Sequence, residues 1–210
     1  MDIVRADEVA VARYAETLCE LMWATGPVSY AYHFAERAVF DALVSRSVRA
    51  AGTLFGWDAM HLAMHGDALL GAMVAYEGPQ YRERQRALGG LWPALMEAGI
   101  VDADDLKGVI ERSRRASWLN PVIQPRVWYI HAISVAPEAR GKHVGAALID
   151  QAMTDGRAAG CRALELDVLS DNPATGFYRS RGLELLVESR APEPEAFGVP
   201  PEWRMGIDLR

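Results

Sequence analysis

The segment from Ile133 to Ile149 constrains the fold of this chain more than any other part of the sequence. An apolar run typical of a β-strand stops at Pro137, a basic turn with two glycines follows, and an amphipathic helix begins at once. The backbone N–H groups at such a helix start point outward and carry partial positive charge. This geometry suits phosphate groups, so the segment predicts an α/β protein that holds a phosphorylated ligand at the turn.

The spacing around this turn excludes two common phosphate-binding loops. The NTPase loop requires Gly-x-x-x-x-Gly-Lys-Ser/Thr, whereas Gly141-Lys142 is followed by His143 and no glycine lies five positions before Gly141. The dinucleotide-binding pattern Gly-x-Gly-x-x-Gly is also absent from the sequence. The turn therefore indicates a different phosphorylated ligand.

The turn resembles motif A of the GNAT superfamily of N-acetyltransferases, whose pattern is Gln/Arg-x-x-Gly-x-Gly/Ala. Arg140 and Gly145 match this pattern, while His143 stands where the family usually has its first glycine. We expect the His143 side chain to point away from the ligand and its backbone to avoid conformations reserved for glycine.

A second segment, 171–184, resembles motif B of the same family. One predicted helix and one predicted strand separate it from motif A, as the family requires, so that the two motifs with their linking elements cover about residues 130–187. The matching positions are Asn172, Ala174, Phe177, Tyr178 and Gly182.

The resemblance implies that acetyl-CoA binds where the fourth and fifth strands separate. Main-chain groups of Ile133 and Val135 would bind the pantetheine arm, and the turn would hold the pyrophosphate. No metal is expected. The implied cofactor-binding residues are Ile133, Ser134, Val135, Arg140, Gly141, Lys142, His143, Val144, Gly145, Ala146, Asn172, Ala174, Phe177 and Tyr178.

Two side chains are candidates for proton transfer. Tyr178 matches the motif B tyrosine that commonly protonates the departing thiolate of CoA; the alternative is a buried aromatic with a satisfied hydroxyl. His131 resembles the strand histidine of the arylalkylamine acetyltransferases and could accept the amine proton; the alternative is a histidine held by a backbone carbonyl. Asn172 is either a ligand of the pantetheine arm or a helix cap, or both. Lesser candidates for the base are Tyr129, Glu77 and the glutamates at 193, 195 and 202.

The composition fits one globular domain spanning 1–210, with 50% apolar and 24% charged residues. The net charge of −6 disfavours nucleic-acid binding and is compatible with a cationic amine substrate. No apolar run reaches the length of about 18 residues that indicates a membrane span, and no signal sequence is evident, so we expect a cytoplasmic protein. Cys19 and Cys161 show no disulfide or metal pattern, and the histidines show no zinc pattern.

The resemblance implies a mixed, mostly antiparallel sheet flanked by helices. The helical insertion at 78–125, between the third and fourth strands, would border the acceptor or build a dimer contact; otherwise it is a solvated hairpin. The acceptor pocket is expected to draw on 23–35, 78–125 and 189–202. The predicted strands are 3–6, 60–65, 68–76, 126–135, 164–168, 184–188 and 203–209, and the predicted helices are 8–23, 28–50, 82–98, 102–117, 144–159 and 172–180.

These observations predict an N-acetyltransferase that transfers acetyl from acetyl-CoA to a primary amine by direct attack in a ternary complex. No cysteine lies at a motif position, which fits the absence of a covalent enzyme intermediate. The alternatives are an enzyme using another acyl-CoA, or a non-catalytic CoA-binding or interaction module. The acceptor could be a small molecule or a peptide, and a homodimer is common in the family; the sequence specifies neither.

Overall fold

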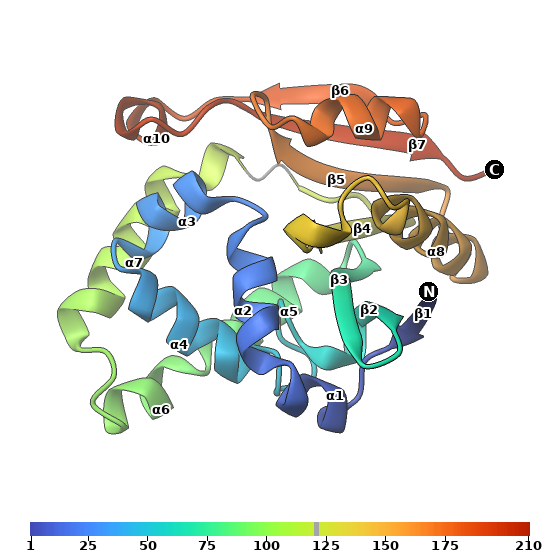
Figure 1. The fold of residues 1–210 in the computed structure, drawn as a ribbon. Coiled ribbons are helices and arrows are strands. Elements are labelled where there is room, and N and C mark those ends of the chain that lie inside the picture. The colour runs from blue at the N-terminus through green and yellow to red at the C-terminus, as the bar shows by residue number, and fades with distance from the viewer. Residues whose placement is uncertain (120–121) are drawn as a thin grey trace.

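Seven strands form one sheet in the computed structural model, which describes residues 1–119 and 122–210. They lie in the order β1-β2-β3-β4-β5-β7-β6, and among these strands only β4 and β5 pair in parallel (Figure 1). The predicted mixed, mostly antiparallel sheet is therefore confirmed. The strands are β1 (Asp2–Arg5), β2 (Met60–His65), β3 (Ala68–Glu77), β4 (Val127–Val135), β5 (Ala163–Leu169), β6 (Glu184–Ser189) and β7 (Glu202–Asp208).

Helices cover the sheet and extend beyond it at one end. They are α1 (Glu8–Arg13), α2 (Ala15–Trp23), α3 (Pro27–Phe34), α4 (Arg37–Ser47), α5 (Gln80–Gly89), α6 (Trp92–Glu97), α7 (Ala103–Arg115), α8 (Val144–Ala158), α9 (Ala174–Ser180) and α10 (Pro192–Phe197). Helix α8 packs across β1 to β5, whereas α2 packs on β3 and β4. In Figure 1, α3, α4, α6 and α7 gather on the left, away from α8 on the right. Across the described ranges, no helix has the length and apolarity needed to cross a bilayer.

The core lies on both sides of the central strands. On one side, Leu148 and Ile149 of α8 are fully buried against the sheet. On the other side, Phe40 and Val44 of α4 are fully buried in the layer of helices. Burial of each such side chain stabilises the fold by roughly 1.5–3 kcal/mol. The apolar spacing in these helices therefore fixes which faces meet the sheet.

Two predicted N-terminal helices are each divided in the structure. The predicted helix 8–23 breaks at Tyr14, whose hydroxyl donates to the Asp67 carbonyl at 2.9 Å and ties the break to the β2–β3 turn. The predicted helix 28–50 breaks at Ala35, which adopts φ 60°. The expectation of two continuous helices is wrong because tertiary contacts override the local helical pattern there.

Among its described residues, the insertion between β3 and β4 contains three α-helices rather than the predicted two. The predicted helix 82–98 divides into α5 and α6 at Gly90, and α6 begins next to Pro93. The predicted loop of the insertion, between α7 and β4, includes residues 120 and 121, which lie outside the described residues. The predicted loop 189–202 contains α10, whose first turn has Pro192 at its start.

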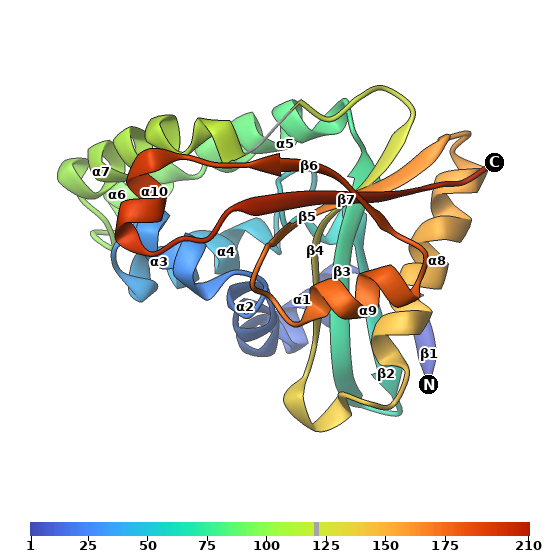
Figure 2. The same ribbon diagram turned by 90° about the horizontal axis from the view of Figure 1, so that it is seen from above.

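The insertion is tied to the loop that carries α10. The Arg115 guanidinium bonds Glu193 at 2.7 Å, and the Tyr32 hydroxyl donates to the same carboxylate at 3.4 Å. Ala191 and Val199 are buried beside Tyr32. Figure 2 shows α10 beside α3 and the insertion helices, so these elements close one end of the molecule.

An irregularity in β4 opens the middle of the sheet. Strand β4 pairs with β5 only from Val127 to Ile130. On its other edge the pairing with β3 shifts register, so that Ile130 and Ala132 have partners on β3 and His131 is an extra, bulged residue. Beyond this bulge, β4 has no strand partner on its β5 side among the described residues.

Candidate active site

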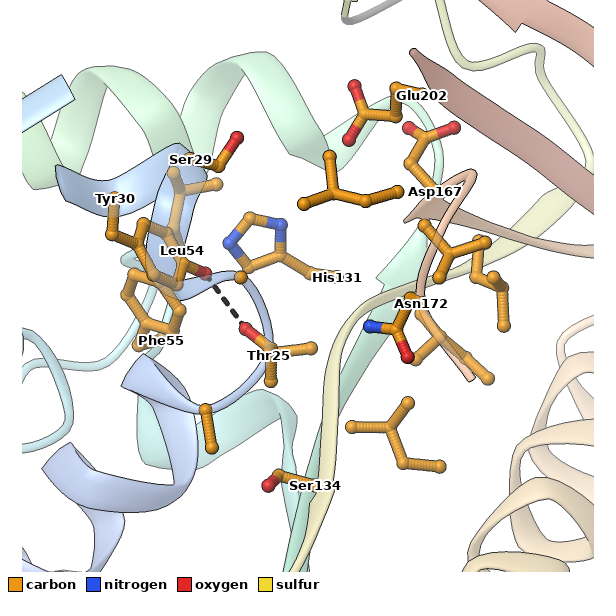
Figure 3. A pocket seen from close by; sticks show the side chains of 18 of the residues that line it. Thr25, Ser29, Tyr30, Leu54, Phe55, His131, Ser134, Asp167, Asn172 and Glu202 are labelled. Carbon is orange, nitrogen blue, oxygen red and sulfur yellow. Dashed lines mark hydrogen bonds between the residues drawn. The ribbon is translucent and has the colours of Figure 1, made fainter. Parts of the chain in front are cut away.

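A cavity of about 1600 Å³ fills the opening between β4 and β5. It runs from the turn before α8 to the helices α3, α5 and α7, and its walls come from segments that are far apart in the sequence (Figure 3). Every predicted site residue except Lys142 lines it, namely His131, Ile133, Ser134, Val135, Arg140, Gly141, His143, Val144, Gly145, Ala146, Asn172, Ala174, Phe177 and Tyr178. Lys142 is exposed in the turn.

The first turn of α8 presents unbonded backbone N–H groups to one end of this cavity. Bonding within the helix begins where Ala147 N–H donates to the His143 carbonyl at 3.1 Å. Within residues 1–119 and 122–210, the N–H groups of Val144, Gly145 and Ala146 therefore have no acceptor, and no side chain caps the helix. The dipole of this 15-residue helix adds positive potential at the same place, so the turn suits a diphosphate.

The departure from the family pattern at His143 is accommodated by its backbone. His143 adopts φ 61° and ψ 12°, in the left-handed region, which favours glycine but is not reserved for it. The chain must turn sharply after Gly141, at φ 74°, and the left-handed region is accessible to histidine more readily than to most side chains. His143 therefore provides the turn that a glycine would provide.

Close packing at Gly145 keeps the turn narrow. A Cβ atom there would lie 3.3 Å from Phe177 Cζ and 3.7 Å from Val135 Cγ2. The motif B helix thus packs directly against the motif A turn, and a small residue leaves the backbone accessible to a ligand.

The open edge of β4 offers hydrogen-bonding groups to an extended ligand. Ala136 N–H donates to the Leu70 carbonyl on β3 at 2.9 Å. Because N–H groups alternate between the two edges of a strand, those of Ile133 and Val135 face β5 across the opening. The Val135 carbonyl accepts from Arg140 Nε at 3.4 Å. This edge therefore presents main-chain groups to the cavity at the positions predicted for the pantetheine arm.

Tyr178 and Asn172 bring polar groups from motif B to the cavity. The Tyr178 ring is buried, and burial raises the pKa of its hydroxyl to about 12, so it stays protonated and able to donate at neutral pH. Asn172 Oδ1 accepts from Ala174 N–H at 2.9 Å, which holds the start of α9. Its amide lies at the cavity wall in Figure 3.

His131 occupies the bulge, surrounded by aromatic rings. Its ring centroid lies 4.9 Å from that of Phe55 and 6.0 Å from that of Tyr81. Burial, with a smaller effect of the Arg84 charge, lowers the pKa of His131 to about 4, so the imidazole is neutral near pH 7. Its Nε2 atom is enclosed without a partner in the described chain, and no backbone carbonyl holds the ring, contrary to the alternative interpretation of a carbonyl-bonded histidine.

A carboxylate cluster that the sequence analysis largely missed forms another wall. Arg204 binds Asp167 through Nε at 2.8 Å and Nη2 at 2.7 Å, and the Tyr129 hydroxyl donates to Asp167 at 2.9 Å. Glu202 lies beside Asp167 and faces the cavity (Figure 3). Burial and the Asp167 charge raise the pKa of Glu202 to about 8, although Arg204 opposes this effect. The available signal was the charge at alternate positions, Glu165 and Asp167, of the strand predicted at 164–168.

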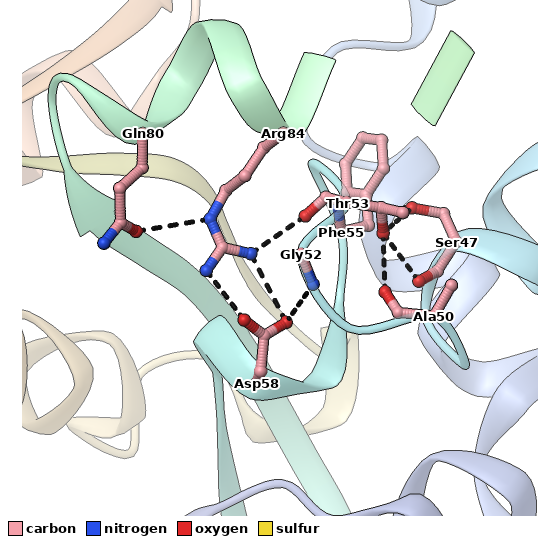
Figure 4. A network of polar contacts seen from close by, with 8 residues as sticks. All are labelled: Ser47, Ala50, Gly52, Thr53, Phe55, Asp58, Gln80 and Arg84. Carbon is pink, nitrogen blue, oxygen red and sulfur yellow. Dashed lines mark hydrogen bonds and ion pairs between the residues drawn. The ribbon is translucent and has the colours of Figure 1, made fainter. Parts of the chain in front are cut away.

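Arg84 of the insertion joins a polar network with the turn that carries Phe55 (Figure 4). Its guanidinium binds Asp58 at 2.8 and 3.3 Å and donates to the Thr53 carbonyl at 3.1 Å. Asp58 also accepts from Gly52 N–H at 2.9 Å. This network fixes the turn that carries Phe55 into the cavity wall, so the insertion contributes directly to the site.

The family model for the Acetyltransferase (GNAT) family matches residues 16–183. The chain belongs to this family. The GNAT assignment makes it an acyl-CoA-dependent acetyltransferase, as the sequence predicted. A search among curated proteins found no match.

Solved structures share this GNAT fold along the whole chain. An N-acetyltransferase from Staphylococcus aureus Mu50 has a TM-score of 0.71 at 12% identity, with 99% of this chain and 100% of that chain covered. A structure described only as an acetyltransferase has a TM-score of 0.65 at 16% identity and full coverage of both chains. A polyamine N-acetyltransferase of Drosophila melanogaster, described as forming N-acetylagmatine, has a TM-score of 0.57 at 18% identity, with coverages of 99% and 100%. In the residues that the structure describes, no three His, Cys, Asp or Glu side chains gather as a metal site requires.

Proposed function

We propose that this GNAT enzyme transfers the acetyl group of acetyl-CoA to a primary amine by direct attack, with both substrates bound together. One observation carries the proposal: the anion-binding turn, the open edge of β4, Tyr178 and His131 all line one continuous cavity. Its volume of about 1600 Å³ exceeds the usual range of about 300–1,000 Å³ for a single-ligand pocket, which supports the binding of two substrates.

The residues present fit acetyl-CoA, which supplies an activated acetyl thioester. The N–H groups at the start of α8 would bind the diphosphate, and the edge of β4 at Ile133 and Val135 would align the pantetheine arm. Tyr178 would donate its proton to the departing sulfur. His131, neutral and enclosed, would take a proton from the amine nitrogen once that nitrogen has bonded to the carbonyl carbon, because bonding makes its protons far more acidic.

The cysteines support direct attack rather than an acyl-enzyme. Cys19 and Cys161 are buried, and neither lines the cavity. Burial raises the pKa of Cys19 to about 11 and also raises that of Cys161, so both thiols stay protonated at neutral pH. A protonated, enclosed thiol is a poor acyl carrier.

A thiol-release assay with acetyl-CoA and a panel of amines tests this proposal. We expect CoA release that depends on the amine, and a Tyr178→Phe variant that loses about 100-fold or more in kcat while its Kd for CoA is unchanged. Tyr32→Phe is the matched control, because Tyr32 is a buried tyrosine outside the cavity lining. Release that no amine stimulates, or a Tyr178→Phe variant with the kcat of wild type, would contradict the proposed mechanism.

A further inference from the structure

We propose that Glu202 binds the ammonium group of the acceptor and accepts its proton, so that the acceptors are organic cations. This inference rests on the acetyl transfer proposed above. It concerns one part of the cavity, here called the acceptor compartment, which is bounded by Tyr30 of α3, Tyr81 of α5, Tyr129 and His131 of β4, and Glu202 of β7.

The walls of the acceptor compartment suit a cation. Tyr81 packs with its ring centroid 6.0 Å from those of Tyr129 and His131. The Tyr30 hydroxyl bonds Thr25 Oγ1 at 3.0 Å on the side away from Glu202 (Figure 3). The faces of tyrosine rings attract organic cations, most strongly where water is excluded. Burial raises the pKa of all three tyrosines, that of Tyr81 to about 12, so their hydroxyls stay neutral.

The charges facing Glu202 leave it without a counterion of its own. On β5 this charge is that of Asp167, and on β7 the only one among the described residues is that of Arg204. The Arg204 guanidinium donates two hydrogen bonds to Asp167, and its Nη1 atom lies 3.7 Å from Glu165 Oε2. In the described chain, the Glu202 carboxylate makes no hydrogen bond or ion pair with any side chain or backbone group. Glu202 is half-buried and lines the cavity, and an ammonium ligand bound there would supply the partner that its carboxylate lacks.

The chain offers two proton acceptors of different strength for the two protons that the ammonium must lose. Glu202, with its pKa raised to about 8, takes the proton of the bound ammonium as the N–H bond breaks. The freed electron pair bonds to the acetyl carbon, and the C–S electron pair leaves on sulfur, which takes the Tyr178 proton. His131 takes the remaining surplus proton from nitrogen. Tyr178 regains one proton and the other passes to solvent, so one proton is released for each acetyl group transferred.

The pH dependence of kcat/KM tests this assignment in the unmodified enzyme. Below pH about 8 the Glu202 carboxyl is protonated and cannot accept, so kcat/KM rises through this range. Above the acceptor's own pKa it falls, because the ammonium is the form that binds. In Glu202→Gln we expect kcat/KM to be at least 100-fold lower at neutral pH. It should not level off above pH 8 but should continue to rise to the acceptor's pKa, because only the free amine can then react.

Tetramethylammonium provides a second measurement, because it carries the positive charge and cannot react. It should inhibit wild type competitively against the amine, and Glu202→Gln should weaken this inhibition at least tenfold. Glu184→Gln is the matched control, since Glu184 is exposed on the neighbouring strand β6. An active wild type without the rise near pH 8, or a Glu202→Gln variant with wild-type kcat or wild-type inhibition, would overturn this inference while leaving acetyl transfer intact. A wild type that transfers acetyl to no amine would overturn both.

Discussion

The ion pair between Arg84 and Asp58 gives a prediction whose size follows from the structure. The Arg84 side chain is 10% exposed and that of Asp58 is 29% exposed. Arg84→Met keeps most of the packing over the Tyr76 ring, which lies 4.9 Å from the guanidinium carbon, but removes both bonds to Asp58. Breaking a buried pair costs about 3–5 kcal/mol, and the partial exposure of Asp58 reduces this to about 2–3 kcal/mol.

Chemical denaturation at pH 7 measures this loss directly. A change of about 2–3 kcal/mol corresponds to a fall in Tm of about 4–12 °C for a chain of this length. Arg86→Met is the matched control, because Arg86 is an exposed arginine on the same helix, and it should change the free energy of unfolding by less than about 0.5 kcal/mol.

The same pair also sets a pH dependence. Burial alone would raise the pKa of Asp58, but the bonds from Arg84 and Gly52 outweigh it and lower the pKa below its ordinary value of 3.8. The stabilisation by Arg84 is therefore present above pH 3.8 and is lost as the pH falls through the lowered pKa. An Arg84→Met variant as stable as wild type at pH 7, or a stability difference that grows below pH 3.8, would refute this reasoning.

Two further predictions concern the cavity itself. Gly145→Val should weaken CoA binding at least tenfold in calorimetry, because a Cβ atom added there would lie 3.3 Å from Phe177 and a branched side chain would cover the turn. Gly176→Ala is the control, because a Cβ atom added at Gly176 would meet no atom within 4 Å. Equal CoA affinities of the two variants would contradict the proposed diphosphate site. His131→Asn should lower kcat about 100-fold. It should not alter the rise of kcat/KM near pH 8, because burial lowers the pKa of His131 to about 4. Loss of that rise in the variant would show that His131, and not Glu202, titrates near pH 8.

The sheet and the turn before α8 were predictable because their signals are local. The strand, Pro137, the glycines and the helix of motif A lie within one short segment, and motif B follows after one helix and one strand. The division between α5 and α6 was also signalled, by Gly89, Gly90 and Pro93, although a continuous helix was expected. By contrast, nothing near Ala35 in the sequence marks the break between α3 and α4, which depends on how these helices pack.

The acceptor side of the site was less predictable because it is assembled from distant segments. His131 was identified on its strand, but its position in a bulge depends on the register between β3 and β4. Glu202 was only one of several candidate bases, since its place beside Asp167 results from the pairing of β5 with β7. The contact of Arg84 with Asp58 joins the insertion to the turn before β2 and has no signature in either segment.

The central claim is that the start of α8 binds the diphosphate of CoA while the pantetheine arm lies along the open edge of β4. A crystal structure of the protein with acetyl-CoA tests it most directly. We predict phosphate oxygens within about 3 Å of the N–H groups of Val144, Gly145 and Ala146, and the thioester between Tyr178 and His131. A bound acetyl-CoA whose diphosphate lies away from this turn would contradict the account.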